Sequence, residues 1–330
     1  MSTSTEKVLE VKNLEVRFAG QRGMVRTLHG ISFDLYRGRS LGIVGESGSG
    51  KSSMALALMR LVVPPLGMVS GDYIKLEGRD ILNMPIDQMS AIRGNRMSMI
   101  FQEAMTSLNP VLTIGEQIIE IIQVHQKLSK QEAKERCLEL LELVCISAPN
   151  KRMGEYAHQI SGGMRQRVMI AMALACNPAV LIADEPTTAL DVTTQAQIID
   201  LLRRLQEDIK MSVILITHDL GVVAELCRDV AVMYCGRFIE QAAIQDIFDH
   251  PRHPYTRALL DSVPDLNQHE RGRLLTIEGV VPTFDKLPSG CHFQDRCRYT
   301  QSSCRSEKPK LQEINANHYV ECLYPLKDKD

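Results

Sequence analysis

The chain has 330 residues, with 38 Lys and Arg against 40 Asp and Glu and a hydrophobic fraction of 44%. This composition excludes a disordered or collagen-like chain, and the length allows one large domain or two smaller ones. The formal net charge of −2 argues against sequence-independent binding of nucleic acid. No apolar run reaches the ~18 residues that cross a bilayer, and the polar N-terminus lacks a signal core. We therefore expect a chain that neither spans a membrane nor enters a secretory route.

Residues 1 to about 250 alternate short β-branched runs with helical patterns. The runs expected to form strands are residues 31–35, 40–44, 97–101, 180–184, 213–217 and 230–234. The runs at 180–184 and 213–217 are almost entirely apolar, which is typical of parallel strands covered on both faces. Residues 1–250 are therefore predicted to form an α/β domain.

Two regions depart from this alternation. From about residue 103 to 160 the strand signals give way to helical ones, and Ser129 with Glu132 has the spacing of a capping box. We expect a helical subdomain inserted between two strands. Residues 251–330 are rich in proline and loops, and we interpret them as a small C-terminal appendage.

Residues 45–52 read GESGSGKS, which matches the pattern G-x-x-x-x-G-K-[ST] in full. The segment follows an apolar strand and precedes a helical run, as a phosphate-binding loop requires. Its glycines allow successive backbone N–H groups to face one anion, and the helix N-terminus adds positive potential. Lys51 is expected to reach the β- and γ-phosphates, and Ser52 to ligate Mg²⁺. The expected nucleotide-binding residues of this loop are Gly45, Ser47, Gly48, Ser49, Gly50, Lys51, Ser52 and Ser53.

A second candidate site feature lies at the end of the apolar strand predicted at 180–184, where two acidic residues, Asp184 and Glu185, are adjacent. The carboxyl ends of parallel strands are where open α/β sheets place ligands. Successive strand residues point to opposite sides, so Asp184 can serve the Mg²⁺ shell while Glu185 faces the attacking water.

Residues 161–166 read SGGMRQ and precede a helical run. Two glycines after a serine at a helix start form another nest of N–H groups for an anion. Together with the two preceding elements, this segment resembles the signature motif of ABC-type ATPases. The resemblance implies that nucleotide is contacted by Ser161, Gly162, Gly163 and Gln166.

Four more positions match the same family in order. Gln102 is similar to the Q-loop glutamine that ligates Mg²⁺, and residues 188–191 (TALD) resemble the D-loop with Asp191. His218 resembles the switch histidine at the γ-phosphate, and Phe18 the aromatic residue on which adenine stacks. Ile160 stands where the family usually has Leu, and Thr188 where Ser is commoner. The resemblance implies a hydrolysis-competent ATPase with Glu185 and His218 as catalytic residues.

In ABC ATPases two such domains face each other head to tail, and each ATP is capped by the partner's signature motif. The resemblance thus implies a second ABC ATPase subunit, either a paralogue or another copy of this chain. It also implies two integral membrane permease subunits, on which the chain is peripheral at the cytoplasmic face of the inner membrane.

Three segments resemble the dipeptide/oligopeptide importers within this family. They are HPYT at 253–256, IEGVVP at 277–282 and SLNP at 107–110. The expected cargo is a di- or oligopeptide delivered by an extracytoplasmic binding protein, with nickel chelates, glutathione and opines as alternatives in the same branch. A soluble ABC ATPase of DNA repair or translation is the runner-up, and a metal-sensing module with vestigial ATPase parts is a third hypothesis.

The chain has nine cysteines. Five lie singly in apolar segments and are expected to be buried free thiols: Cys137, Cys145, Cys176, Cys227 and Cys235. The other four follow C-x5-C-x6-C-x17-C: Cys291, Cys297, Cys304 and Cys322. This spacing suits an iron–sulfur cluster or Zn²⁺ equally, and unligated thiols remain an alternative. The resemblance to peptide importers favours [4Fe-4S].

Overall fold

The computed structural model describes residues 6–21, 23–102, 107–188, 190–262 and 276–327. The chain divides into two compact units, each assembled from separate segments. The first unit contains Met1–Glu10, Asp34–Ser40 and Lys75–Ile216. The second unit contains Val11–Phe33, Leu41–Ile74 and Thr217–Asp330.

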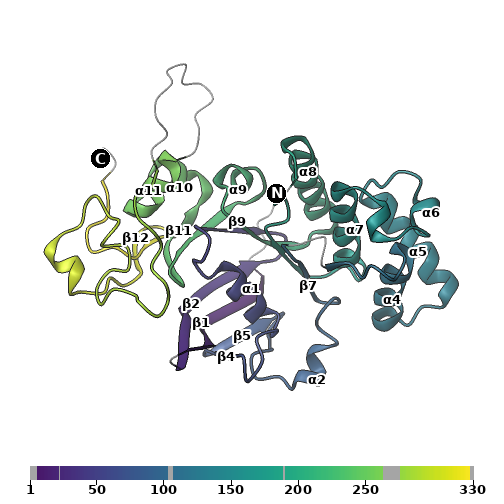
Figure 1. The fold of residues 1–330 in the computed structure, drawn as a ribbon, viewed down its shortest axis with the longest axis horizontal. Coiled ribbons are helices and arrows are strands. Elements are labelled where there is room, and N and C mark those ends of the chain that lie inside the picture. Colours follow the sequence, from purple (N-terminus) through teal and green to yellow (C-terminus); the bar gives the residue numbers. More distant parts are fainter. Residues whose placement is uncertain (1–5, 22, 103–106, 189, 263–275, 328–330) are drawn as a thin grey trace, which may run out of the picture. The chain divides into compact units, whose positions relative to one another are not determined.

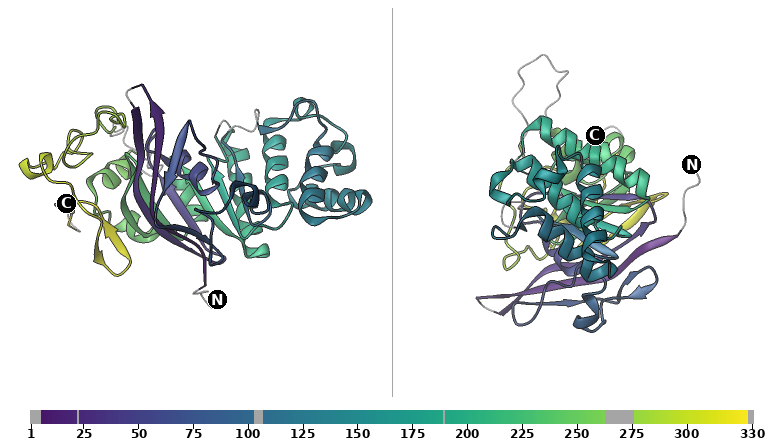
Figure 2. Two further views of the ribbon diagram at one scale, coloured as in Figure 1. Left: turned by 90° about the horizontal axis from the view of Figure 1, so that it is seen from below. Right: turned by 90° about the vertical axis from the view of Figure 1, so that its right-hand side faces the viewer.

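The second unit contains long antiparallel strands. Strands β1 (Lys7–Gly20) and β2 (Gly23–Tyr36) belong to it for most of their length and are neighbours in one sheet (Figure 2). Strand β4 (Gly67–Ser70) pairs antiparallel with β1, placing Phe18 opposite Gly67.

A second sheet in this unit begins at the strand that leads into the phosphate loop. Strand β3 (Ser40–Val44) pairs parallel with β10 (Asp229–Tyr234). From β10 the sheet continues through β11 (Arg237–Ala243) to β13 (His318–Val320) and β12 (Gln312–Asn315), all antiparallel. The C-terminal residues therefore extend the sheet of the phosphate loop.

The helices of the second unit are α1 (Lys51–Leu58), α9 (Leu220–Leu226), α10 (Ile244–Asp249) and α11 (Pro254–Asp261), with a 3-10 turn at Ser302–Arg305. Helices α10 and α11 lie side by side (Figure 1). Glycine at position 42 permits close packing of α9 on β3, since a Cβ there would lie 2.3 Å from Val223 Cγ1.

The first unit is built on parallel strands. Strands β7 (Met97–Ile100), β8 (Val180–Asp184) and β9 (Ser212–Thr217) pair in that order. Helices α7 (Gly162–Leu174) and α8 (Val192–Ile209) belong to the same unit. A short hairpin joins β5 (Tyr73–Leu76) to β6 (Arg79–Asp80), and α2 (Ile86–Met89) follows it.

The helical insertion is present in the first unit. Helices α4 (Ile114–Gln126), α5 (Lys130–Leu143) and α6 (Pro149–Arg152) gather beside α7 (Figure 1), and a 3-10 turn covers Ala157–Gln159. The predicted capping box of Ser129 and Glu132 is confirmed, and Thr113 forms a second one with Glu116. Residues 103–106, where the insertion was expected to begin, lie outside the described residues.

The sequence predictions for the fold are largely confirmed. Five of the six expected runs are strands or lie within one, and the α/β class holds. The run at 97–101 forms β7 up to Ile100 and extends one residue past its end. The domain boundary near residue 250 stays a prediction. One expectation for the free thiols is wrong: Cys145 is exposed, in a left-handed turn with φ 57°, whereas the other four are buried. Within the described residues, no helix combines the length and apolarity required to cross a membrane.

Candidate functional site

The phosphate loop connects the fully buried strand β3 to helix α1. Two of its glycines have left-handed backbone angles, Gly48 at φ 79° and Gly50 at φ 107°. Gly45 needs its lack of a side chain for another reason, since a Cβ there would lie 2.2 Å from the carbonyl oxygen of Met233. The glycines at these positions are therefore required by the path of the backbone.

Lys51 lies at the start of α1 with its side chain folded over the loop. Its Nζ donates to the carbonyl oxygens of Gly45 at 2.7 Å and Glu46 at 3.0 Å. The residue is only 5% exposed. The ammonium group is thus held inside the curve of the loop, where phosphate oxygens would meet it.

The serines of the loop have different surroundings. Ser47 is exposed and Ser52 and Ser53 are half-buried, so they are open to a ligand. Ser49 is fully buried, and its carbonyl accepts a hydrogen bond of 2.7 Å from the N–H of Gly236. Ser49 therefore anchors the loop to the turn between β10 and β11.

Phe18 and His218 were also predicted to contact nucleotide. Phe18 is half-buried on β1 in the same unit as the phosphate loop, and its ring lies against Gly67. His218 directly follows β9 and is exposed, and the next residue, Asp219, caps α9 through hydrogen bonds from Gly221 and Val222. Phe18 is therefore partly exposed to solvent and His218 is exposed, and their contacts with nucleotide stay predictions.

The two carboxylates at the end of β8 have distinct environments. Asp184 is 3% exposed, whereas Glu185 is half-buried. Glu185 has a left-handed φ of 47°, which is uncommon for a residue with a side chain, and its N–H donates to the carbonyl of Ile216 at 2.8 Å. The change of backbone direction after Asp184 separates the two acids.

Glu185 is the centre of a small polar cluster in the first unit. Its Oε2 accepts hydrogen bonds from Gln102 Nε2 at 3.1 Å and from Thr188 Oγ1 at 2.8 Å. The structure therefore brings together three residues that were predicted separately from the Q-loop, the strand end and the D-loop. Such a carboxylate is fixed in orientation and still accessible to water.

The signature segment begins helix α7. Ser161 is its N-cap, and its Oγ accepts from the N–H of Met164 at 3.3 Å. Ser161 and Gly162 are exposed, and a Cβ at Gly162 would meet nothing within 4 Å. Gly163 instead faces α8, because a Cβ there would lie 2.8 Å from Thr194 Cγ2. An open face for an anion thus exists at Ser161 and Gly162.

Two other residues predicted to contact nucleotide, Gln166 and Asp191, lie in helix α7 and at the start of helix α8. Gln166 is 4% exposed within α7, away from the open face at Ser161. Asp191 is the N-cap of α8, accepting from Thr194 N at 3.0 Å and Thr194 Oγ1 at 2.7 Å, and these hydrogen bonds lower the pKa of its carboxyl. Their roles toward nucleotide stay predictions, and Ala189 of the D-loop lies outside the described residues.

The four cysteines of the C-terminal segment line one cavity, together with Phe293 and Tyr324 among others. Burial raises the pKa of the Cys291 thiol to about 11 and that of Cys322 to about 12. A backbone hydrogen bond links two of these cysteines, since the N–H of Cys291 donates to the carbonyl of Cys304 at 2.8 Å. Among the described residues, no group of three or more His, Cys, Asp or Glu side chains is arranged to hold a metal ion. The metal site is not confirmed and stays a prediction.

Sequence reasoning missed the contacts that Glu46 makes with Tyr255 and Arg296 at the phosphate loop. Glu46 of the loop contacts Tyr255 and Arg296, which come from α11 and the cysteine-bearing segment. Tyr255 stood in a noted motif, but nothing in the sequence indicated its neighbour.

Comparisons with known proteins agree with this geometry. The family profile described as ABC transporter matches residues 28–188, and the profile described as oligopeptide/dipeptide transporter, C-terminal region, matches residues 239–304. The ATP-binding cassette MJ0796, in a dimeric post-hydrolysis structure with ADP and Pi, has a TM-score of 0.62 and 28% identity. That similarity covers 72% of this chain and 98% of the cassette. The fold is that of an ABC-type P-loop ATPase.

Two relatives define the branch. The chain is 48% identical to the oligopeptide transport ATP-binding protein AppD of Bacillus subtilis, over 96% of both chains. It is 49% identical to the oligopeptide transport ATP-binding protein OppD of Haemophilus influenzae, again over 96% of both. The chain belongs to the ABC transporter ATP-binding proteins, in the group that carries the oligopeptide/dipeptide transporter C-terminal region.

Replacing Lys51 with Ala should weaken Mg-ATP binding at least about tenfold, because it removes the side-chain cation that the loop encloses. Titration calorimetry with the full chain measures this directly. Lys151→Ala is the control, since Lys151 is an exposed lysine of the helical insertion, and it should leave affinity unchanged. If the Lys51→Ala and Lys151→Ala variants bind Mg-ATP with equal affinity, Lys51 does not bind phosphate.

Replacing Glu185 with Gln should preserve Mg-ATP binding and reduce hydrolysis at least about 100-fold, because an amide keeps the shape of the side chain but cannot take a proton from water. Phosphate release under saturating ATP is the measurement. Hydrolysis within about threefold of wild type would contradict the assignment of Glu185.

Proposed function

We propose that this chain hydrolyses ATP to energise the import of di- or oligopeptides across a membrane. The similarity to AppD and OppD over 96% of the chain carries this proposal. The HPYT and IEGVVP segments add to it, because both fall within the matched C-terminal region.

The phosphoryl chemistry in this proposal is a matter of positioning and charge. The loop N–H groups and Lys51 hold the phosphates, and Glu185, oriented by Gln102 and Thr188, aligns and deprotonates the attacking water. The ABC resemblance assigns Mg²⁺ to Ser52, Gln102 and Asp184, a set of hydroxyl, amide and carboxylate oxygens that suits this ion. His218 is assigned to the γ-phosphate, and Phe18 to the adenine ring.

The proposal includes two kinds of partner. A second ATPase subunit, either a paralogue or another copy, would present its serine and glycines to this chain's nucleotide, and Ser161 would serve the partner in return. Exposure of Ser161 and Gly162 supports this role. Two integral permease subunits would hold the chain at the cytoplasmic face of the inner membrane, with an extracytoplasmic binding protein supplying the peptide.

We also propose that Cys291, Cys297, Cys304 and Cys322 hold a [4Fe-4S] cluster. Their shared cavity supports this proposal, and four thiolates are the usual donor set for such a cluster. Because burial raises the pKa of the Cys291 and Cys322 thiols, their ligation as thiolates would release protons, and it would contribute to the folding of a loop-rich segment. Zn²⁺ is the alternative occupant.

Peptide uptake tests the transport proposal. Cells lacking this chain should lose uptake of a labelled tripeptide, wild type should restore it, and Glu185→Gln should not. Cys145→Ser is the matched control, because that exposed thiol is outside every proposed site. If cells lacking this chain take up the tripeptide normally but lose uptake of a nickel chelate or glutathione, that compound is the cargo instead of a peptide. If the chain co-purifies with ribosomes or DNA in place of membrane subunits, the transport function is wrong.

Iron and acid-labile sulfide analysis tests the cluster. Protein purified without oxygen should contain about four of each per chain and absorb visible light. Cys304→Ser should lose both, whereas Cys145→Ser should keep them. A colourless protein with about one equivalent of Zn²⁺ would overturn the choice of iron and sulfide.

A further inference from the structure

Glu46, the second residue of the phosphate loop, is held from the C-terminal part of the chain. Its two carboxylate oxygens accept hydrogen bonds from Arg296, at 2.6 Å from Nη1 and 2.9 Å from Nη2. Its backbone N–H donates to the hydroxyl of Tyr255 at 2.9 Å. Both the side chain and the backbone of this loop residue are therefore fixed by residues more than 200 positions later in the sequence.

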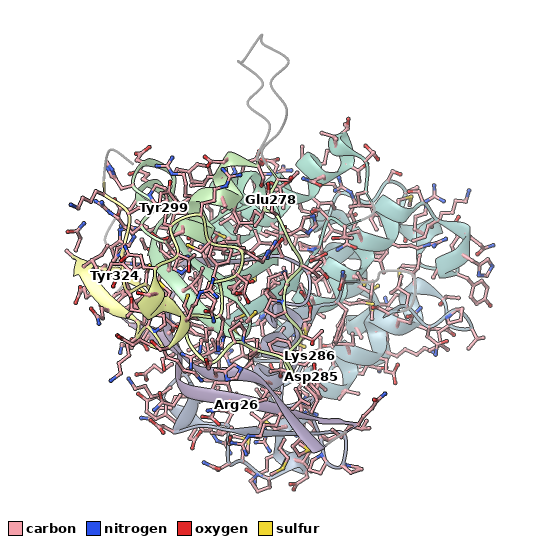
Figure 3. All side chains as sticks on the ribbon, turned by 60° about the vertical axis from the view of Figure 1, so that its left-hand side comes forward. Arg26, Glu278, Asp285, Lys286, Tyr299 and Tyr324 are labelled. Carbon is pink, nitrogen blue, oxygen red and sulfur yellow. The ribbon has the colours of Figure 1, made fainter. Side chains whose placement is uncertain are left out.

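Arg296 is rigid enough to act as a fixed anchor. Its side chain is 5% exposed. Its Nε donates to the carbonyl of Glu278 at 3.0 Å, and Nη2 reaches the carbonyl of Ile277 at 3.5 Å. The guanidinium also lies 5.9 Å from the centre of the Tyr234 ring. Ile277 and Glu278 are the first two residues of the IEGVVP motif, and Glu278 is labelled in Figure 3. Backbone carbonyls of this motif therefore help to position Arg296.

Tyr255 is anchored equally well. Its ring is fully buried and packs against Tyr234 and Phe293, with ring centroids 4.7 and 5.3 Å away. Its own N–H donates to Nδ1 of His253 at 3.0 Å, which sets the start of α11. The HPYT motif thus places one hydroxyl at the backbone of the phosphate loop.

We propose that Arg296 and Tyr255 are positioning residues that hold the phosphate loop ready for nucleotide through Glu46, which rests on the proposed ATP-binding function of the loop. A loop already in its binding shape loses less conformational entropy when phosphate arrives. The carbonyl of Glu46 also accepts from Lys51 Nζ at 3.0 Å. The same residue therefore connects the C-terminal anchor to the phosphate-binding cation.

Charge gives the arrangement a second effect. A carboxylate in a phosphate loop repels the anion that the loop binds, and a bidentate guanidinium offsets that repulsion. Removing the arginine therefore does two kinds of damage: it loosens the loop and leaves Glu46 uncompensated. Removing the carboxylate loosens the loop but leaves a cation nearby, which attracts phosphate. A merely structural ion pair would show no such asymmetry.

Calorimetric binding of Mg-ATP to the full chain tests the proposal. Arg296→Gln should raise the Kd about tenfold or more and Glu46→Gln about threefold, and the double variant should bind no worse than Arg296→Gln. Tyr255→Phe removes only the hydroxyl and should raise the Kd about threefold. If Arg296→Gln does not fold, Tyr255→Phe is the variant that tests the proposal. Circular dichroism and the Tm establish that each variant is folded.

Arg152→Gln is the matched control. Arg152 Nη1 donates to both carboxylate oxygens of Glu155, at 2.7 and 2.9 Å, in the helical insertion, and both side chains are mostly buried. It should lower the Tm and leave the Kd within about twofold of wild type. The proposal is overturned if folded Arg296→Gln and Tyr255→Phe bind Mg-ATP as well as Arg152→Gln does. If wild type itself does not bind Mg-ATP, the proposed function fails instead.

Discussion

The backbone path of the phosphate loop is the constraint on which the rest of this protein depends. The chain must leave a buried strand, pass directly beneath the carbonyl of Met233, turn twice through left-handed conformations and enter a helix. Only glycine fits the close approach at position 45, and Gly50 adopts an angle that a side chain would oppose. Sheet packing behind the loop and hydrogen bonds around it must supply the rigidity that glycine does not provide.

Glu185, the proposed general base, illustrates a related constraint in the first unit. Glu185 adopts a left-handed conformation that is unfavourable for a residue with a side chain. Its N–H is bonded to Ile216, and its carboxylate to Gln102 and Thr188. These bonds offset the strain and fix the direction of the carboxylate. The residue following a buried strand is thereby turned out of the sheet, which is what separates the roles of Asp184 and Glu185.

How much of this was predictable depends on the range of each interaction. The phosphate loop and the strand ending at Asp184 were predicted because each is a local pattern with a single structural solution. The antiparallel strand β12 was missed because its residues are mostly exposed and its pattern does not alternate. Cys145 was misjudged because its apolar neighbours suggested burial, although the backbone turns outward there. Arg296 could not be assigned from sequence, since its partner lies 250 residues away and arginine in a tail usually faces solvent.

Glu240 explains why the C-terminal region belongs to the nucleotide-binding unit. Its carboxylate is fully buried on β11, where burial is costly unless every oxygen is bonded. It accepts from the N–H groups of Arg252 at 2.6 Å and His253 at 2.9 Å, and lies 2.8 Å from Nε2 of His318 on β13. One carboxylate therefore joins the sheet, the start of α11 and the added C-terminal strands. Since α11 carries Tyr255, which bonds to the backbone of Glu46, the contacts of the buried Glu240 extend through the start of this helix to the phosphate loop.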